Sequence, residues 1–435
     1  MGRREASVAV VAAAAVAATW SLLKRRRRAA RLAGHAKVVL LPAERSPVIC
    51  MSPSTSTITF FHGSIEDAEA WLEDRVAAIV RANPWLAGRL DDDPETGLMA
   101  LFVPPGAADA KLFEARCDVA VRRDAPYDDI VAAVAAVLCG TSDADRGTAK
   151  PLFRVTLLPC ADDPAYSYAL VVSANHSLLD GHGYYRVHSM LSQGADVEAL
   201  RPERNADLPP LMTAAMGGET SLLQDAKPGF VARFLVAQLR NALFPATASY
   251  GFFVDEAWLA ARKGEAAVGV AYVSTNDCLV SDVLRLLGCD VALMAANFRG
   301  RVDGCGDDDV GNYEDLIAFT PSDYATPALV RKAIAAPPLL RETRAALPTN
   351  VGHLGATYGA VTNWATFAKP LEIPGGDQDL HLPLFDWNQS TPASCFGAMV
   401  IFRPSEGATA AFVAGRRDFV DAVKAAPLAG RALFS

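Results

Sequence analysis

The chain has 435 residues, of which 51% are apolar and 21% charged, and its formal net charge is −8. This length and composition predict a large core divided between two domains, and they exclude long disordered segments. The eight cysteines include no C-x-x-C pair, which favours buried thiols in a reducing compartment over zinc ligands. Because their number is even, disulfides in a secreted protein remain the alternative.

The amino-terminal segment differs from the rest of the chain. Residues 6–23 form an apolar run, long enough to span a bilayer, with two arginines before it and six basic residues at 24–31. The positive-inside rule then predicts one membrane anchor with the rest of the chain facing the cytoplasm, for example at the endoplasmic reticulum. A cleaved organelle-targeting leader is the alternative, because the segment is rich in Arg and Ala and poor in acids.

The charge of the remaining chain excludes one class of function. Residues 47–435 carry 31 basic and 47 acidic side chains, a formal charge of −16. Nucleic-acid binding needs an excess of positive charge, so we expect no nucleic-acid partner. Membrane topology or anionic lipid headgroups explain the basic cluster at 24–31 better.

The periodicity predicts strands and helices in two halves. Residues 193–227 are rich in Pro, Gly, Asp and Glu without a sustained period, which predicts a crossover. The expected domains are an anchor and basic flank at 1–46, an N-terminal domain at 47–205, a linker at 206–245 and a C-terminal domain at 246–435. Strands are predicted at 58–61, 99–103, 152–158, 168–173 and 291–297, and helices at 64–82, 127–139, 183–191 and 276–287.

The most informative stretch is 175–181, with the sequence N-H-S-L-L-D-G directly after a predicted buried strand. A loop after such a strand can hold a side chain rigidly at a cavity. The imidazole of His176 could there take a proton from a hydroxyl or an amine at neutral pH. Asp180 can orient a neighbour, and Gly181 leaves room for a ligand close to the backbone. Chance alone gives about 0.06 H-x-x-x-D-G patterns in such a chain, so the pattern is suggestive.

This stretch resembles the H-x-x-x-D-G motif of the acyl-CoA-dependent acyltransferases, which include chloramphenicol acetyltransferase, the BAHD enzymes and peptide-synthetase condensation domains. Other motifs of that superfamily occur before and after this stretch, in the order that the superfamily has them. They are N-P-W-L-A-G-R-L at 83–90, S-T-N-D at 274–277, R-G-R at 299–301, G-N at 311–312 and T-N-W at 362–364. The late D-F-G-W-G of BAHD enzymes is replaced by L-F-D-W-N-Q at 384–389, which weakens assignment to BAHD proper.

The resemblance implies an α/β fold of two pseudo-symmetric chloramphenicol-acetyltransferase-like domains. Each would be a mixed β-sheet covered by helices, with an active-site tunnel between them. It also implies that His176 is a general base for direct attack of an acceptor on an acyl-CoA thioester, without a covalent intermediate. Thr362 and Trp364 would stabilise the oxyanion. Asp180 would pair with Arg299, with Arg301 as the less favoured partner, and take no part in a charge relay.

These roles define the predicted site. The catalytic set is His176, Asp180, Thr362 and Trp364, the supporting residues are Gly181, Arg299 and Arg301, and the substrate contacts are Asn175, Ser274 and Thr275. Several of these segments have structural alternatives. His176 could be a satisfied histidine at a strand-to-turn junction, and Asn276 or Asp277 could simply cap a helix. Trp364 could be core, and Thr362 could be an ordinary strand residue. A metal site is disfavoured, since His182 and His188 would lie about 240° apart around a helix.

We therefore expect a monomeric O-acyltransferase that uses acyl-CoA as co-substrate and acylates a lipophilic alcohol, with no bound cofactor or metal. Alternatives are N-acylation of an amine, a carrier-protein-bound donor as in condensation enzymes, or a membrane-tethered binding protein without turnover. A serine hydrolase is disfavoured because the chain has no G-x-S-x-G nucleophile elbow. The acceptor and the acyl chain length are left open by the sequence.

Overall fold

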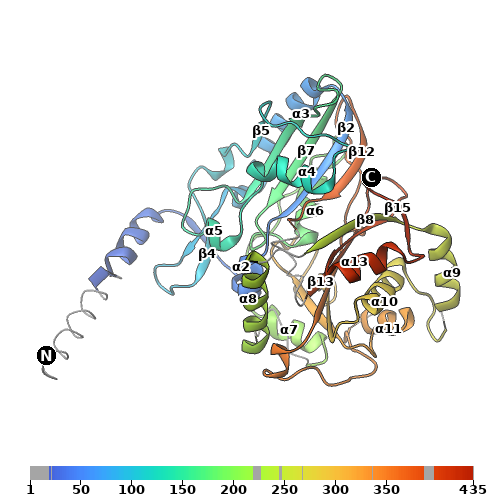
Figure 1. The fold of residues 1–435 in the computed structure, drawn as a ribbon. Helices are drawn as coiled ribbons and strands as arrows, with labels where there is room; N and C mark the ends of the chain where they lie inside the picture. Colours follow the sequence, from blue (N-terminus) through green and yellow to red (C-terminus); the bar gives the residue numbers. More distant parts are fainter. Residues whose placement is uncertain are drawn as a thin grey trace, which may run out of the picture.

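The computed structural model describes residues 19–20, 22–218, 227–243, 247–266, 268–335, 337–386 and 396–434. Two large sheets organise these residues, one in each half of the chain. Figure 1 shows the first sheet above, with β2, β7 and β12, and the second below it, with β8 and β13. The predicted α/β architecture of two mixed sheets covered by helices is confirmed.

The first sheet has the strand order β12-β2-β7-β6-β5, antiparallel except for the β5–β6 pair. Its central strand β7 reads as a continuous apolar run because nearly all its residues are buried. Helix α3 packs Leu72, Val76 and Ile79 into the same core, and the Ser64 hydroxyl caps it by accepting from the Asp67 N–H at 3.2 Å. The strands are β2 (Thr55–Gly63), β5 (Phe113–Ala115), β6 (Phe153–Pro159), β7 (Ser167–Ala174) and β12 (Gly376–Pro383), and the helices are α2 (Pro47–Met51), α3 (Ile65–Ala82), α4 (Tyr127–Val134), α5 (Ser142–Asp145) and α6 (Gly181–Ser189).

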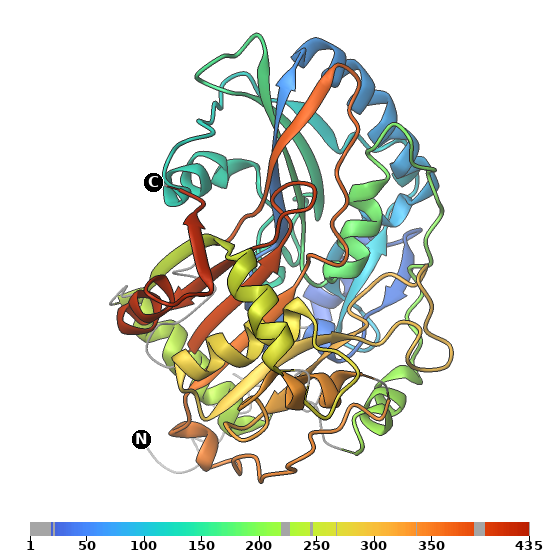
Figure 2. The ribbon, with the colours of Figure 1, turned by 90° about the vertical axis from the view of Figure 1, so that its right-hand side faces the viewer.

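The second sheet has the order β10-β9-β11-β13-β14-β8-β15, with β11 parallel to both β9 and β13. Helix α10 lies across one face, as Figure 2 shows in yellow, and Leu287 approaches closely at Gly359 and Gly397. On the opposite face, Phe230 and Phe234 of α8 (Pro228–Leu243) pack against Val291, Leu293 and Tyr358, and the cavity-lining part faces the first half. The strands are β8 (Ala248–Val254), β9 (Val291–Asn297), β10 (Glu314–Phe319), β11 (Tyr358–Asn363), β13 (Phe396–Phe402), β14 (Ala410–Gly415) and β15 (Ala429–Ala432), and the helices are α9 (Glu256–Ala266), α10 (Thr275–Leu287), α11 (Pro327–Ile334) and α13 (Arg417–Lys424).

The two halves are interleaved by β12. This strand comes from the second half but pairs with β2 of the first sheet, with Leu382 opposite Ile58. His381 fixes the exchange, since its Nδ1 lies 2.8 Å from the Thr59 hydroxyl and its Nε2 lies 2.9 Å from the Tyr185 hydroxyl. No local pattern in the sequence indicates that a strand of the second half pairs with the sheet of the first half.

Most predicted elements are present within two or three residues, and the differences have local causes. The stretch expected to be a linker at 206–245 contains α7 (Leu208–Ala215) and α8 (Pro228–Leu243). Pro209 and Pro210 occupy the first turn of α7, where the missing N–H groups cost no intrahelical bond. The helix expected over 127–139 ends as α4 and continues as a 3-10 helix, η4 (Ala135–Val137).

The segment before residue 47 contributes to the folded body. Strand β1 (Ala36–Val39) pairs with β4 (Met99–Val103), which also pairs with β3 (Arg89–Asp92), and η1 (Ala43–Arg45) follows. Residues 22–31 are helical and extend to the left in Figure 1. Arg28 pairs with Asp91 at 3.0 Å and with Asp92 at 2.7 Å, so part of the basic cluster is neutralised within the protein.

The predicted anchor at 6–23 falls largely outside the described residues, which exclude 1–18 and 21. Within the part of the chain that the structure describes, no helix combines the length and apolar character needed to cross a bilayer. The anchor and the three domain boundaries therefore stay predictions.

Candidate active site

His176 lies in the loop between β7 and α6, on the wall of a cavity of about 230 Å³. The cavity is lined from the first half by α2, the start of β2 and this loop, and from the second half by β9, β10, β11 and β13. Asp180 begins α6 as its N-cap, because its Oδ1 accepts from the Gly183 N–H at 2.8 Å. Strand and cap together fix the backbone on both sides of His176.

Asn312 holds the imidazole in one orientation. Its Nδ2 donates to the backbone carbonyl of His176 at 2.8 Å, so its Oδ1 faces Nδ1 of the ring, 3.1 Å away. An amide oxygen only accepts, and Nδ1 must therefore carry the hydrogen. Nε2 makes no hydrogen bond to any described residue and is left as a lone-pair acceptor. Burial lowers the pKa of His176 below its ordinary value, which keeps the ring neutral at pH 7.

Asp180 does not contact the imidazole. Its Oδ2 lies 2.7 Å from Nη1 of Arg299 and accepts from the Tyr313 N–H at 3.0 Å, in the buried pair that the resemblance implied. Arg299 also donates to the Asp309 and Gly311 carbonyls at 2.8 and 3.1 Å. The pair thus ties the start of α6 to the loop between β9 and β10, which carries Asn312. This contact network supports a structural role for Asp180.

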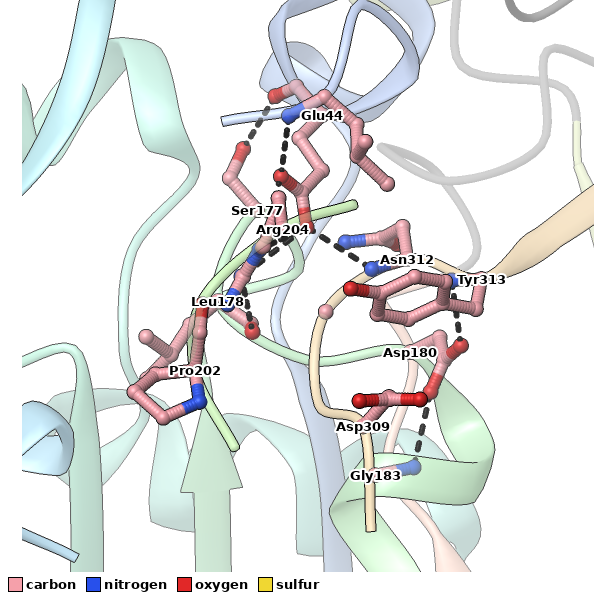
Figure 3. Close-up of polar contacts among 12 residues, drawn as sticks. Glu44, Ser177, Leu178, Asp180, Gly183, Pro202, Arg204, Asp309, Asn312 and Tyr313 are labelled. Carbon is pink, nitrogen blue, oxygen red and sulfur yellow. Dashed lines mark hydrogen bonds and ion pairs between the residues drawn. The ribbon is translucent and has the colours of Figure 1, made fainter. Parts of the chain in front are cut away.

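A second buried ion pair lies on the other side of the same loop (Figure 3). Glu44 and Arg204 lie 3.0 Å apart with almost no exposed surface. Glu44 Oε1 accepts from the Asn312 N–H at 2.8 Å, and its backbone carbonyl accepts from the Ser177 hydroxyl at 2.8 Å. Arg204 donates to the Leu178 carbonyl at 3.1 Å. The segment before residue 47 is therefore attached to both loops that meet at His176.

The floor of the cavity is one face of the second sheet. The register places Leu316 opposite Ala295, and Ala360 opposite both Leu293 and Ala398, so alternate residues of four strands share this face. Its members are Leu293, Ala295, Glu314, Leu316, Ala360, Thr362, Ala398 and Val400. Six of the eight are apolar, and Glu314 is the acidic exception.

Thr362 and Trp364 both line the cavity together with His176. Among the described residues, neither the Thr362 hydroxyl nor the Trp364 indole N–H has a hydrogen-bond partner, so both donors are available to a ligand. Gly181 also lines it, and a Cβ there would lie 3.3 Å from Trp364 Nε1. The late segment contributes Phe385, whose ring lies 5.3 Å from that of Trp364, while residues 387–389 of the altered motif lie outside the described residues.

The predicted substrate contacts lie elsewhere. Asn175 is buried, accepting from the Ser142 hydroxyl at 2.7 Å and donating to the Gly140 carbonyl at 3.1 Å, so its side chain supports the loop. Ser274 is the N-cap of α10, in place of the Asn276 or Asp277 considered from the sequence, and Thr275 is the first residue of that helix. None of the three lines the cavity, so their predicted substrate contacts have no support here.

Arg301 also points away from Asp180. It donates to the Ile334 carbonyl at 3.4 Å, and burial lowers its pKa. Within the described residues, no group of three His, Cys, Asp or Glu side chains is placed to hold a metal ion. His188 lies instead against the rings of Tyr184, Tyr185 and His381.

Three polar residues of the site had no role predicted from the sequence. Asn312 lay within a matched motif but carried no assigned function, while Glu44 and Glu314 lay in no motif. Glu314 carried a weak signal, since a charged residue beginning the apolar run of β10 has to face either solvent, a partner or a cavity.

Comparison with known proteins identifies the fold. Neither a family profile nor a curated protein sequence matches the chain. F. graminearum TRI101, solved with coenzyme A and T-2 mycotoxin, has a TM-score of 0.63, 13% identity, and coverage of 92% of this chain and 100% of its own. The first condensation domain of the CDA synthetase has a TM-score of 0.56 and 15% identity, and the match covers 91% of this chain and 98% of that domain. Polyketide synthase associated protein 5 from Mycobacterium tuberculosis has a TM-score of 0.53 and 14% identity, and the match covers 89% of this chain and 95% of that protein.

The chain thus has the two-half α/β fold that TRI101 and the condensation domain share, over nearly its whole length. The fold class predicted from the H-x-x-x-D-G and accompanying motifs is confirmed. At 13–15% identity the likeness defines the fold, and the chemistry has to be argued from the site.

Proposed function

We propose that this protein transfers an acyl group from acyl-CoA to the hydroxyl of a small acceptor, with His176 as general base. One observation carries the proposal. The His176 ring lines the cavity between the halves, and Asn312 holds Nδ1 so that Nε2 is free to accept a proton. A positioned, neutral imidazole is what direct acyl transfer needs, and it contributes about 10²–10⁴-fold in rate.

The reaction follows from these positions. The acceptor hydroxyl gives its proton to Nε2 as its oxygen forms a bond to the thioester carbonyl carbon. The Thr362 hydroxyl and Trp364 N–H would donate to the oxyanion. Collapse of the tetrahedral intermediate breaks the C–S bond, and the imidazolium returns the proton to the CoA thiolate. The products are the ester and free CoA, and no residue forms a covalent bond with the acyl group.

Structures with this fold support coenzyme A as the donor. TRI101 has been solved with coenzyme A together with T-2 mycotoxin or deoxynivalenol, which places a thiol carrier and a second small molecule on the same fold. The likeness to a condensation domain supports a second possible donor, an acyl group carried by a carrier protein. N-acylation of an amine would use the same His176 chemistry. A binding protein without turnover is less well supported, because it has no need for the oriented imidazole.

We also propose that the protein is attached to a membrane with its folded body facing the cytoplasm. The apolar run at 6–23 supports this, as do Arg26 and Arg27, which form no ion pair with any described residue. Helix α8 contains no acidic residue and exposes Leu235, Leu239 and Leu243, a face suited to a lipid surface. Deletion of residues 2–23 should weaken attachment to membranes, and attachment equal to that of the full chain would contradict the proposal.

The test of acyl transfer uses the full chain, because Glu44 lies before the boundary at 46. Release of free CoA is measured with acetyl- to palmitoyl-CoA and a panel of alcohols, beside His176→Ala. We expect acceptor-dependent release to fall by about 10²–10⁴-fold in the variant. His182→Ala, which removes the histidine directly after the motif, is the matched control. Equal release by wild type and His176→Ala would overturn the proposal.

A further inference from the structure

Among the described residues that line the cavity, Glu314 is the one with an acidic side chain. It begins β10 opposite Asn297 of β9, on the sheet face that also carries Thr362. On that face Ala295 and Leu316 are apolar, and Asn297, directly opposite, accepts through its Oδ1 from Arg299. A carboxyl at this place shares one small space with the His176 imidazole.

Glu314 differs from the other carboxyls around the site because it has no partner. Asp180 is paired with Arg299, and Glu44 is paired with Arg204. The Glu314 carboxyl forms no hydrogen bond or ion pair with any residue that the structure describes. A half-buried carboxyl without a partner either holds a proton or takes a cationic partner, and among the described residues no cation fills that role.

The charged groups acting on Glu314 make it a receptor for positive charge. Asp180 and Asp315 both disfavour its ionisation, and Arg299, already paired with Asp180, offsets them only in part. Burial, the largest effect, and these carboxylates raise the pKa of Glu314 to about 8. The free carboxyl therefore holds a proton at pH 7, and a cation placed beside it would displace that proton.

We propose that Glu314 binds a basic nitrogen of the acceptor, so that the acceptor is an amino alcohol whose ammonium pairs with Glu314 while its hydroxyl faces His176. This inference rests on the proposed acyl transfer. It narrows the acceptor from any alcohol to a cationic one with an apolar remainder, which the aliphatic floor of the cavity would hold. A neutral alcohol would leave the Glu314 carboxyl protonated, whereas an ammonium group would form an ion pair with the ionised carboxylate.

The test compares two acceptors of equal chain length, a 2-amino-1-alkanol and the corresponding 1-alkanol, on wild type and Glu314→Gln. The substitution keeps the shape and removes the charge. For the amino alcohol we expect KM to rise about 10- to 100-fold with kcat little changed, and for the plain alcohol no rise in KM. Equal KM effects on both acceptors, or none on either, would overturn the inference.

A binding measurement keeps the inference testable without turnover. Calorimetric titration of the full chain with the amino alcohol, in two buffers of different ionisation enthalpy, should show proton release at pH 7 that is absent in Glu314→Gln. No difference in release would overturn it. If neither acceptor yields CoA but this release is seen, the proposed reaction fails and the Glu314 site stands. If the plain alcohol is acylated and wild type shows no preference for the amine, only the Glu314 inference fails.

Discussion

Two buried ion pairs flank His176, and only one of them belongs to a recognisable motif. Asp180–Arg299 joins the start of α6 to the loop after β9, and Glu44, which is paired with Arg204, accepts from the Asn312 N–H of the same loop. Both end on the backbone around Asn312, the first at Tyr313 and the second at Asn312 itself. The comparison shows that the motif identifies half of the support for the imidazole, while the other half depends on a contact between distant segments.

The largest expected effect is on stability, from breaking the pair within the motif. Arg299→Met leaves Asp180 buried without a counterion, which should lower the free energy of unfolding by about 3–5 kcal/mol in urea denaturation. Arg301→Met is the control, since its single hydrogen bond at 3.4 Å should contribute about 1 kcal/mol. Similar losses in both variants would mean that the Asp180 pair has no special place in the fold.

Glu44→Gln tests the second pair and should have a smaller effect on stability. We expect a loss of about 1.5–3 kcal/mol, the range for a hydrogen bond to a charged group, and a fall in kcat with KM unchanged. The kcat effect would arise because Asn312 loses its anchor and the imidazole is less well held. Glu95→Gln, which changes an exposed carboxyl in the turn between β3 and β4, should change neither quantity. An unchanged kcat would limit Glu44 to a structural role.

The smallest effect is expected from a change at Asn312, next to which both ion pairs are bonded, and it concerns the pH dependence of activity. Asn312→Asp places a carboxylate against Nδ1, which should raise the pKa of His176 by about 1 unit. Because the base acts only when deprotonated, the acid limb of kcat/KM should move to higher pH by the same amount. The pH profile of the variant beside that of wild type measures this shift. An identical profile would show that Asn312 does not contact the catalytic imidazole.

The sequence predicted the elements and site residues that depend on a short stretch of the chain. The strand at 168–173, the helix ended by Asn83-Pro84 and the loop at 175–181 each follow from a short pattern, and the resemblance located Arg299 beside Asp180. Thr362 and Trp364 also reach the cavity as expected. The predicted contacts at Asn175, Ser274 and Thr275 have no such support, because those residues satisfy their hydrogen bonds within the loop or the helix cap.

The remainder depends on packing between segments far apart in the chain. Glu44 meets Asn312 across 268 residues, and β12 enters the first sheet from the second half. Neither has a signature in periodicity or composition. Glu314 shows a further limit, since alternation in β10 indicates that Glu314 and Asp315 face opposite sides but not that one side is a cavity.

The pH dependence of kcat/KM for wild type tests the central claim most directly. If the His176 imidazole is the base, the acid limb of the profile should rise through an apparent pKa below the ordinary value of about 6.5, because burial disfavours the charged ring. The residual activity of His176→Ala should lack this limb. A limb of the same midpoint in both proteins would contradict general-base catalysis by His176.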